Sequence, residues 1–143
     1  MARFIVTGGT GFVGNSFIKH LLKKGHSVVS ISRRKCEIHG VMSIEIDLTN
    51  RTIVELHEAD FEGDFLIHFV NTQGPSGTEK NIADSYNINI NALKNVLRII
   101  DRKKIKFLYP SSAAVYGKPS ELPISESAVL SPVSSYGIYK ATA

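Results

Sequence analysis

The sequence predicts an α/β domain with a doubly wound parallel sheet in the strand order 3-2-1-4-5. Three observations predict this fold class. Short apolar runs of β type alternate along the chain with stretches of helical periodicity. A glycine-rich turn follows the first run, and the apolar run Phe65 to Val70 suits a central parallel strand covered on both faces. Such alternation implies right-handed crossovers and a ligand at the carboxyl edge of the sheet, where the strand order reverses.

The first half of the chain is expected to supply three strands and two helices. The strands are placed at Arg3 to Thr7, Val28 to Ile31 and Ser43 to Leu48. Glycines end the first strand before a helix whose apolar positions include Val13, Phe17 and Leu21. Gly25 follows two lysines, where a C-terminal helix cap belongs. A weaker helical stretch runs from Arg51 to Glu58.

The second half is expected to hold two more strands and the longest helix. After the strand at Phe65 to Val70 comes a polar loop, Asn71 to Thr78, and then a helix from about Ile82 to Ile100. The fifth strand, Lys106 to Tyr109, ends at a proline. Residues 117 to 135 are expected to be an irregular loop before a last element that begins near residue 135.

Composition excludes several functional classes. The 143 residues suffice for one globular domain, and the single cysteine excludes an internal disulfide, which agrees with a reducing compartment. No histidines pair at helical ligand spacing, so no metal site is expected. No apolar run approaches the roughly 20 residues of a membrane span, and Met1 to Arg3 lead into a strand without the layout of a signal peptide. We therefore expect a cytoplasmic protein without a membrane anchor.

The net charge of +4 does not indicate a nucleic-acid partner. Its lysines and arginines gather near the expected helix ends, where cations interact favourably with the helix dipole. No recognition helix and no basic face interleaved with aromatic residues is present. An anionic small ligand is the better expectation.

The glycine turn predicts a binding site for a dinucleotide. Gly9, Gly11 and Gly14 satisfy the pattern G-x-G-x-x-G, and Gly8 adds a second, overlapping register. In this pattern one glycine permits a tight turn, one lets the pyrophosphate approach the backbone, and one lets helix and strand pack closely. The helix N-terminus then faces the phosphate charge.

The end of the second strand bears on the choice of cofactor. An acidic residue there favours NAD, whereas arginine favours the 2′-phosphate of NADP. The chain has Ser32, Arg33 and Arg34 and no carboxylate, which indicates a weak preference for NADP over NAD, although a solvated basic loop has the same composition. Asp47 can accept from the adenine amino group or cap the next turn.

Six features in order resemble the extended short-chain dehydrogenase/reductases, the family of nucleotide-sugar epimerases and dehydratases. They are TGGTGFVG at 7–14, Asp47-Leu48, DFLIHFV at 64–70, the asparagine segment at 89–92, SSAAVYG at 111–117 and YGIYK at 136–140. The resemblance covers the whole chain and implies a Rossmann fold, with residues 1–143 as the NAD(P)-binding domain. Members of this family are longer, so their C-terminal substrate-binding lobe is expected to be absent from this sequence.

The resemblance assigns roles to individual residues. Tyr136 is implied as the catalytic acid and base, Lys140 as its partner and a contact to the nicotinamide ribose, and Ser112 as the group that orients the substrate. A tyrosine hydroxyl has an ordinary pKa near 10, so a lysine one helical turn away helps it to ionise. The expected cofactor-binding residues are Gly8, Gly9, Gly11, Phe12, Val13, Gly14, Ser32, Arg33, Arg34, Asp47, Leu48, Val70, Asn89, Tyr136 and Lys140.

The residues after Ser112 narrow the expected reaction. Relatives that dehydrate or decarboxylate carry acidic residues there, whereas this chain has Ala113 and Ala114. Hydride transfer needs only the tyrosine and the cofactor, so a nucleotide-sugar epimerase or ketoreductase is expected. The chain departs from the family at Val70-Asn71, usually two small residues, and at Tyr139, usually a small hydroxyl residue. A non-catalytic NAD(P)-binding module or truncated remnant stays an alternative, and a homodimer is considered.

Overall fold

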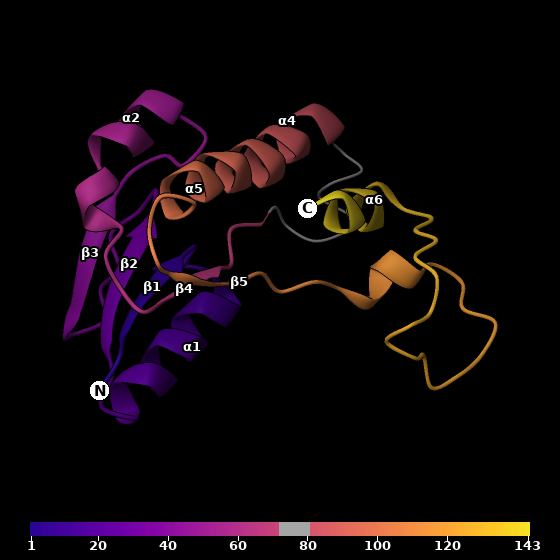
Figure 1. Ribbon diagram of the computed structural model, residues 1–143, viewed down its shortest axis with the longest axis horizontal. Coiled ribbons are helices and arrows are strands. Elements are labelled where there is room, and N and C mark those ends of the chain that lie inside the picture. Colours follow the sequence, from indigo (N-terminus) through magenta and orange to yellow (C-terminus); the bar gives the residue numbers. More distant parts are fainter. Residues whose placement is uncertain (72–80) are drawn as a thin grey trace. The chain divides into compact units, whose positions relative to one another are not determined.

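Five parallel strands form one sheet in the order β3-β2-β1-β4-β5, which confirms the predicted doubly wound topology (Figure 1). They are β1 (Arg3–Thr7), β2 (Ser27–Ser32), β3 (Val41–Glu45), β4 (Phe65–His68) and β5 (Lys106–Leu108). The computed structural model describes residues 1–71 and 81–143, so the loop predicted at 71–78 lies outside the described residues except for its first position. The chain divides into two compact units, residues 1–70 with 91–110, and residues 71–90 with 111–143.

Helices cover both faces of the sheet in the first unit (Figure 1). α1 (Phe12–Lys23) lies on one face, and α2 (Arg51–Leu56) and α5 (Ala92–Ile100) lie on the other. The sheet has a separate hydrophobic core on each face, and neighbouring residues of β1 point into different ones. Ile5 packs beneath α2 and α5, whereas Val6 packs beneath α1. This two-sided burial explains why the inner strands are apolar at consecutive positions.

The end of α1 confirms the cap predicted at Gly25. Gly25 has a φ of 78°, in the region that favours glycine. Its N–H donates to the Leu22 carbonyl at 2.9 Å, and the His26 N–H donates to the Leu21 carbonyl at 3.1 Å. These two bonds form a Schellman motif, which stops the helix and turns the chain into β2.

The third strand differs from its predicted bounds, Ser43 to Leu48. β3 starts two residues earlier, at Val41, and ends three residues earlier, at Glu45. Ile46 and Leu48 keep the alternating burial of a strand, each 4% exposed, but they lie beyond β3. The Asp47 side chain bends the chain there, since its Oδ1 accepts from the Thr49 N–H at 2.9 Å and from the Thr49 hydroxyl at 2.8 Å. The alternation of apolar residues therefore predicted the burial of Ile46 and Leu48 correctly, but it overestimated the length of the strand.

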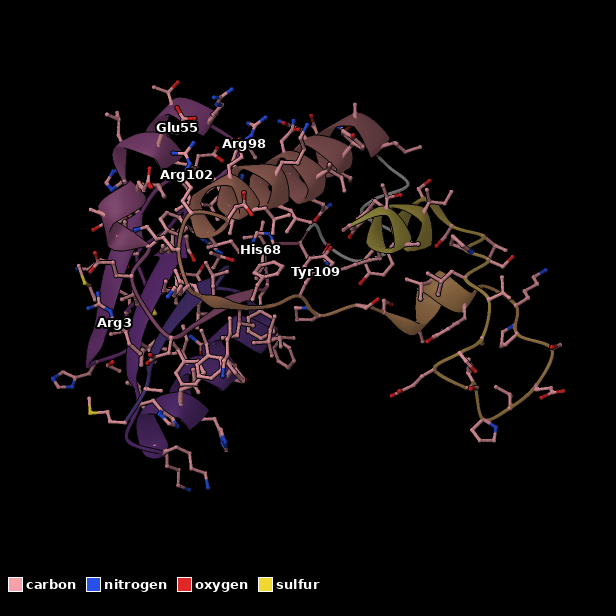
Figure 2. The ribbon with its side chains drawn as sticks, in the orientation of Figure 1. Arg3, Glu55, His68, Arg98, Arg102 and Tyr109 are labelled. Atoms are coloured by element: carbon pink, nitrogen blue, oxygen red, sulfur yellow. The ribbon has the colours of Figure 1, made fainter. Side chains whose placement is uncertain are left out.

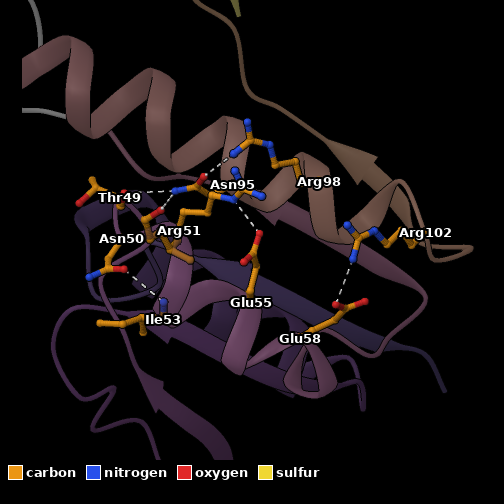
Figure 3. A network of polar contacts seen from close by, with 10 residues as sticks. Thr49, Asn50, Arg51, Ile53, Glu55, Glu58, Asn95, Arg98 and Arg102 are labelled. Carbon is orange, nitrogen blue, oxygen red and sulfur yellow. Dashed lines mark hydrogen bonds and ion pairs between the residues drawn. The ribbon is translucent and has the colours of Figure 1, made fainter.

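A buried amide fixes the turn that follows β3 against α5. The Asn95 Nδ2 atom donates to the carbonyl of Leu48 at 2.9 Å and to that of Thr49 at 3.2 Å (Figure 3). On the surface nearby, Arg102 and Glu58 form an ion pair with a 3.5 Å separation. Exposed pairs of this kind contribute little, so the buried Asn95 contacts are the ones that hold this segment.

A second buried polar contact lies at the carboxyl ends of β1 and β4. The Thr7 hydroxyl and His68 Nδ1 are 2.7 Å apart, and both residues are almost fully buried. The His68 ring lies 6.1 Å from the ring of Tyr109 (Figure 2). This contact joins the two central strands directly below the glycine turn.

The helix predicted from Ile82 to Ile100 is interrupted. It consists of α4 (Ile82–Tyr86), a π-helical turn at Asn87–Asn91, and α5. Within the turn, Asn89 is 2% exposed and its Nδ2 donates to the Ser85 carbonyl at 2.6 Å. An asparagine side chain that takes a helical carbonyl competes with the backbone ladder, which accounts for the irregularity.

In the second unit, α6 (Ser135–Thr142) packs closely on a 3-10 helix, Ala113–Tyr116, which the sequence did not predict. Gly137 permits this approach. A Cβ atom there would stand 2.5 Å from the Ala114 carbonyl oxygen and 3.0 Å from the Pro132 side chain. The glycine after Tyr136, the predicted catalytic tyrosine, is therefore required by packing, and it brings the serine and tyrosine motifs together.

Candidate functional site

The glycine turn is built tightly against the end of β4. Gly8 has a φ of 73°, and a Cβ atom there would stand 2.8 Å from the Val70 nitrogen. Gly14 is equally confined, since its Cβ would stand 2.5 Å from the Gly8 carbonyl oxygen and 2.9 Å from the Gly9 Cα atom. Only glycine satisfies these contacts, because each neighbouring atom belongs to the backbone. The turn thereby brings the predicted residue Val70 next to Gly8.

The outer side of the same turn is open. Gly11 is exposed, and a Cβ atom there would meet only the Gly8 carbonyl oxygen, at 3.3 Å. Gly11 is the N-cap of α1 and carries no side-chain cap. Helix N-termini present backbone N–H groups that lie ahead of the hydrogen-bond ladder, and they attract anions. The confined inner glycines and the open outer one fit a pyrophosphate group at this turn.

The first helical residues leave apolar surface beside this anion-binding position. Phe12 is 92% exposed and Val13 is 57% exposed, although both are large apolar side chains in the first turn of α1. A dinucleotide bound at the turn would cover such surface. The structure therefore places both predicted residues at the rim of the candidate cofactor site.

The end of β2 lies at the same sheet edge. Arg33 and Arg34 are exposed, whereas Ser32 is 5% exposed and its Oγ has no hydrogen-bond partner among the described residues. The Ile46 N–H donates to the Ser32 carbonyl at 3.0 Å, which brings the chain after β3 alongside. Two exposed guanidinium groups and a buried hydroxyl therefore border the place where a ribose would lie.

The predicted adenine-side residues divide into two kinds. Asp47 is half-buried, and its Oδ1 accepts a hydrogen bond from the Thr49 N–H. That oxygen therefore caps the turn, which is the second of the two roles predicted for Asp47. The side chain of Leu48 belongs to the core under α2 and α5. Asn89 is buried in the second unit, in the π-helical turn.

The three predicted catalytic residues all lie in the second unit. Ser112 is the N-cap of the 3-10 helix, and its Oγ accepts from the Ala114 N–H at 3.2 Å. Tyr136 is in the first turn of α6, which Ser134 caps by accepting from the Gly137 N–H at 3.1 Å. A serine held by a short helix and a tyrosine held by a capped helix are thus presented by two elements in close contact.

Lys140 lies one turn after Tyr136 on α6 and is 8% exposed. Burial lowers the pKa of its ammonium group below the ordinary value of 10.5, because desolvation disfavours the charged form. A buried lysine one turn from a tyrosine fits the role of a cationic partner to a phenolate.

Replacing Lys140 by methionine is expected to stabilise the chain at neutral pH. The charged lysine is desolvated only in the folded state, so its burial opposes folding. Between the lowered pKa and 10.5 the unfolded state binds more protons, so the stability of the unsubstituted chain rises with pH in that window. The advantage of Lys140→Met should therefore shrink toward alkaline pH. Thermal unfolding at pH 7 and pH 10 measures both effects, and a lower Tm of the variant at pH 7 would contradict the argument.

Sequence reasoning missed two residues beside Tyr136. Asn71 and Tyr139 were singled out only as departures from the family pattern, yet both contact each other, and Asn71 reaches Tyr136. The available signal was the i, i+3 spacing of Tyr136 and Tyr139, which places both on one helical face.

The described residues hold no group of three or more histidine, cysteine or acidic side chains arranged to bind a metal ion. Within residues 1–71 and 81–143, no helix combines the length and apolar character needed to cross a membrane.

Known proteins resemble this chain in sequence and in structure. The chain is 27% identical over 141 residues to the UDP-glucose 4-epimerase of Lactobacillus helveticus. This alignment covers 94% of the chain and 43% of the Lactobacillus protein. It resembles the solved UDP-glucose 4-epimerase from Bifidobacterium longum in complex with NAD+ and UDP, with a TM-score of 0.86, 25% identity, and coverage of 98% and 46% of the two chains. The Bordetella bronchiseptica enzyme WbmG in complex with NAD and UDP gives a TM-score of 0.83 at 26% identity, with coverage of 98% and 47%.

The chain thus spans 43% of the length of the Lactobacillus relative while nearly all of its own length is aligned. A family comparison agrees with these similarities and extends from β1, at residue 4, to the last residue, 143. The chain belongs to the NAD dependent epimerase/dehydratase family.

Proposed function

We propose that this chain is the cofactor-binding part of an NAD(P)-dependent nucleotide-sugar epimerase or ketoreductase that works by hydride transfer. The observation that carries the proposal is the glycine turn, confined at Gly8 and Gly14 and open at Gly11. Such a turn at a helix N-terminus admits a pyrophosphate. The relatives support the substrate class, since two of them are UDP-glucose 4-epimerases and two solved structures contain NAD with UDP.

The proposed chemistry uses the three side chains of the second unit. The glycine turn would hold a nicotinamide cofactor, which would supply hydride-transfer chemistry. Tyr136 would take the proton of the substrate hydroxyl during oxidation and give it back during reduction. Lys140 would favour the ionised phenol by its positive charge, and Ser112 would orient the reacting oxygen. Since Ala113 and Ala114 offer no acid or base, an elimination step is not proposed.

Calorimetry and turnover together test this proposal. NAD or NADP titrated into the folded 143-residue chain should bind, and a longer chain that continues into a substrate-binding lobe should interconvert UDP-glucose and UDP-galactose or reduce a keto-sugar nucleotide. Absence of binding by either dinucleotide would reject the cofactor site. Binding with no turnover in the longer chain would support the alternative, a non-catalytic NAD(P)-binding module or a truncated remnant.

A preference for NADP over NAD is a separate part of the proposal, supported by the exposed Arg33 and Arg34 at the end of β2. Arg33→Ala is expected to weaken NADP binding by roughly tenfold or more, because a charge-assisted hydrogen bond contributes about 1.5 to 3 kcal/mol. NAD affinity should stay unchanged, since NAD lacks the 2′-phosphate. Lys35→Ala, which removes a neighbouring exposed charge, is the matched control. Equal affinities of the unsubstituted chain for both cofactors would refute the preference.

A homodimer is proposed through the second unit. An apolar hollow of about 200 Å³ lies between α4 and α6, and Ile82, Tyr86 and Ile138 around it are each more than half exposed. Apolar surface of this kind favours association with a second copy. Sedimentation is expected to show a dimer that Ile138→Arg converts to a monomer, and a monomeric unsubstituted chain would contradict the proposal. The cytoplasmic location stays a prediction, with which the single cysteine agrees.

A further inference from the structure

Two tyrosines of α6 lie against each other near the proposed catalytic centre. The rings of Tyr136 and Tyr139 are 5.2 Å apart and almost perpendicular, at 83°, which is a favourable edge-to-face arrangement. Tyr139 is 6% exposed, so its ring is held by packing. Its hydroxyl donates a hydrogen bond to Oδ1 of Asn71.

This contact orients the amide of Asn71. Because a side-chain amide is planar, fixing its oxygen on Tyr139 also fixes the direction of its nitrogen. That nitrogen, Nδ2, lies 3.5 Å from the hydroxyl oxygen of Tyr136 and donates to it. Asn71 and Tyr136 are 65 residues apart in sequence and belong to the same compact unit. A buried tyrosine, an amide and the candidate acid and base therefore form one chain of contacts.

We propose that Asn71 is a positioning residue that Tyr139 holds in place so that its amide donates a hydrogen bond to the ionised phenol of Tyr136. The inference rests on the proposed function, in which Tyr136 exchanges a proton with the substrate. When the phenol gives up its proton to the substrate oxygen, the amide keeps both of its own protons and stabilises the remaining negative charge. A donor to an ionised oxygen favours ionisation.

Asn71 and Tyr139 are two of the three positions, with Val70, at which the chain departs from the pattern that the family resemblance implies. A small residue at position 71 would lack the side-chain amide, and a small hydroxyl residue at position 139 would lack the ring that packs against Tyr136. The paired departures are explained if each side chain is useful only in the presence of the other.

The titration of Tyr136 tests the proposal without any need for turnover. Tyrosine labelled with ¹³C at Cζ gives one signal for each ring, and Tyr136→Phe identifies the signal that belongs to position 136. Asn71→Asp replaces the donor by a carboxylate, so the midpoint of that signal should move to higher pH by about one unit. Asn71→Ala should move it in the same direction by less, and Tyr139→Phe should do so because the amide is no longer held.

Controls separate this effect from a general change of charge. Asn50→Asp adds the same charge at an exposed helix N-cap of the first unit, where aspartate caps as well as asparagine, and Lys140 is unchanged in every variant. A shift in Asn71→Asp no larger than in Asn50→Asp would overturn the proposal, as would an unchanged midpoint in Tyr139→Phe. Failure here would leave the proposed function intact, because that function is decided by the turnover of the longer chain with and without Tyr136.

Discussion

Replacing Gly11 by leucine is expected to lower the affinity of the chain for its dinucleotide roughly a hundredfold, the equivalent of losing one or two charge-assisted hydrogen bonds. Gly11 caps α1 on the exposed side of the turn, with an extended backbone at a φ of −77° and a ψ of 169°. Any residue adopts this conformation, and a Cβ atom meets only the Gly8 carbonyl oxygen, at 3.3 Å. The leucine side chain therefore enters the space of the ligand rather than the core, and the Tm should be almost unchanged.

Gly14→Leu is the matched variant that separates binding from folding. At this buried position a Cβ atom would stand 2.5 Å from one backbone atom of the turn and 2.9 Å from another. The helix would have to move away from β1, so this substitution should lower the Tm strongly. Calorimetry and thermal unfolding of both variants measure the contrast. An undiminished affinity in a folded Gly11→Leu chain would show that the dinucleotide binds elsewhere.

The fold could be predicted because its signals are local. Apolar runs and glycines specify strands and turns through nearby residues alone, and the helix cap at Gly25 was predicted on that basis. The errors arose where a side chain overrides the backbone pattern. Asp47 turns the chain after β3, and Asn89 takes a helical carbonyl within the π-helical turn, and hydrophobic periodicity detects neither effect.

The candidate site could be predicted in part for the same reason. The motif resemblance makes Ser112, Tyr136 and Lys140 candidates, and the structure adds the burial of Lys140 and the packing at Gly137. The contact between Asn71 and α6 joins positions 65 residues apart, so no pattern within one element reveals it.

Tyr136→Phe is expected to lower turnover by a factor of about 10² to 10⁴, the usual contribution of a general acid and base. We expect turnover only from a polypeptide longer than this chain, which spans 43% of the length of its Lactobacillus relative. Phenylalanine keeps the ring and its edge-on contact with Tyr139, so the fold and most of the cofactor affinity should survive while the proton-exchanging oxygen is lost.

The assay compares three forms of that longer protein. Tyr116→Phe removes a hydroxyl from the 3-10 helix that follows Ser112 and should leave turnover unchanged, which controls for the loss of any tyrosine hydroxyl from this unit. The dissociation constant for the cofactor, measured on each form, separates a defect in chemistry from a defect in binding. If the Tyr136→Phe form retained full turnover, proton exchange would have to be carried by another group. If the 143-residue chain itself proved an efficient catalyst, the expectation that a further lobe encloses the nucleotide-sugar would be wrong, because positioning of the reacting carbon would then need nothing beyond the residues of this sequence.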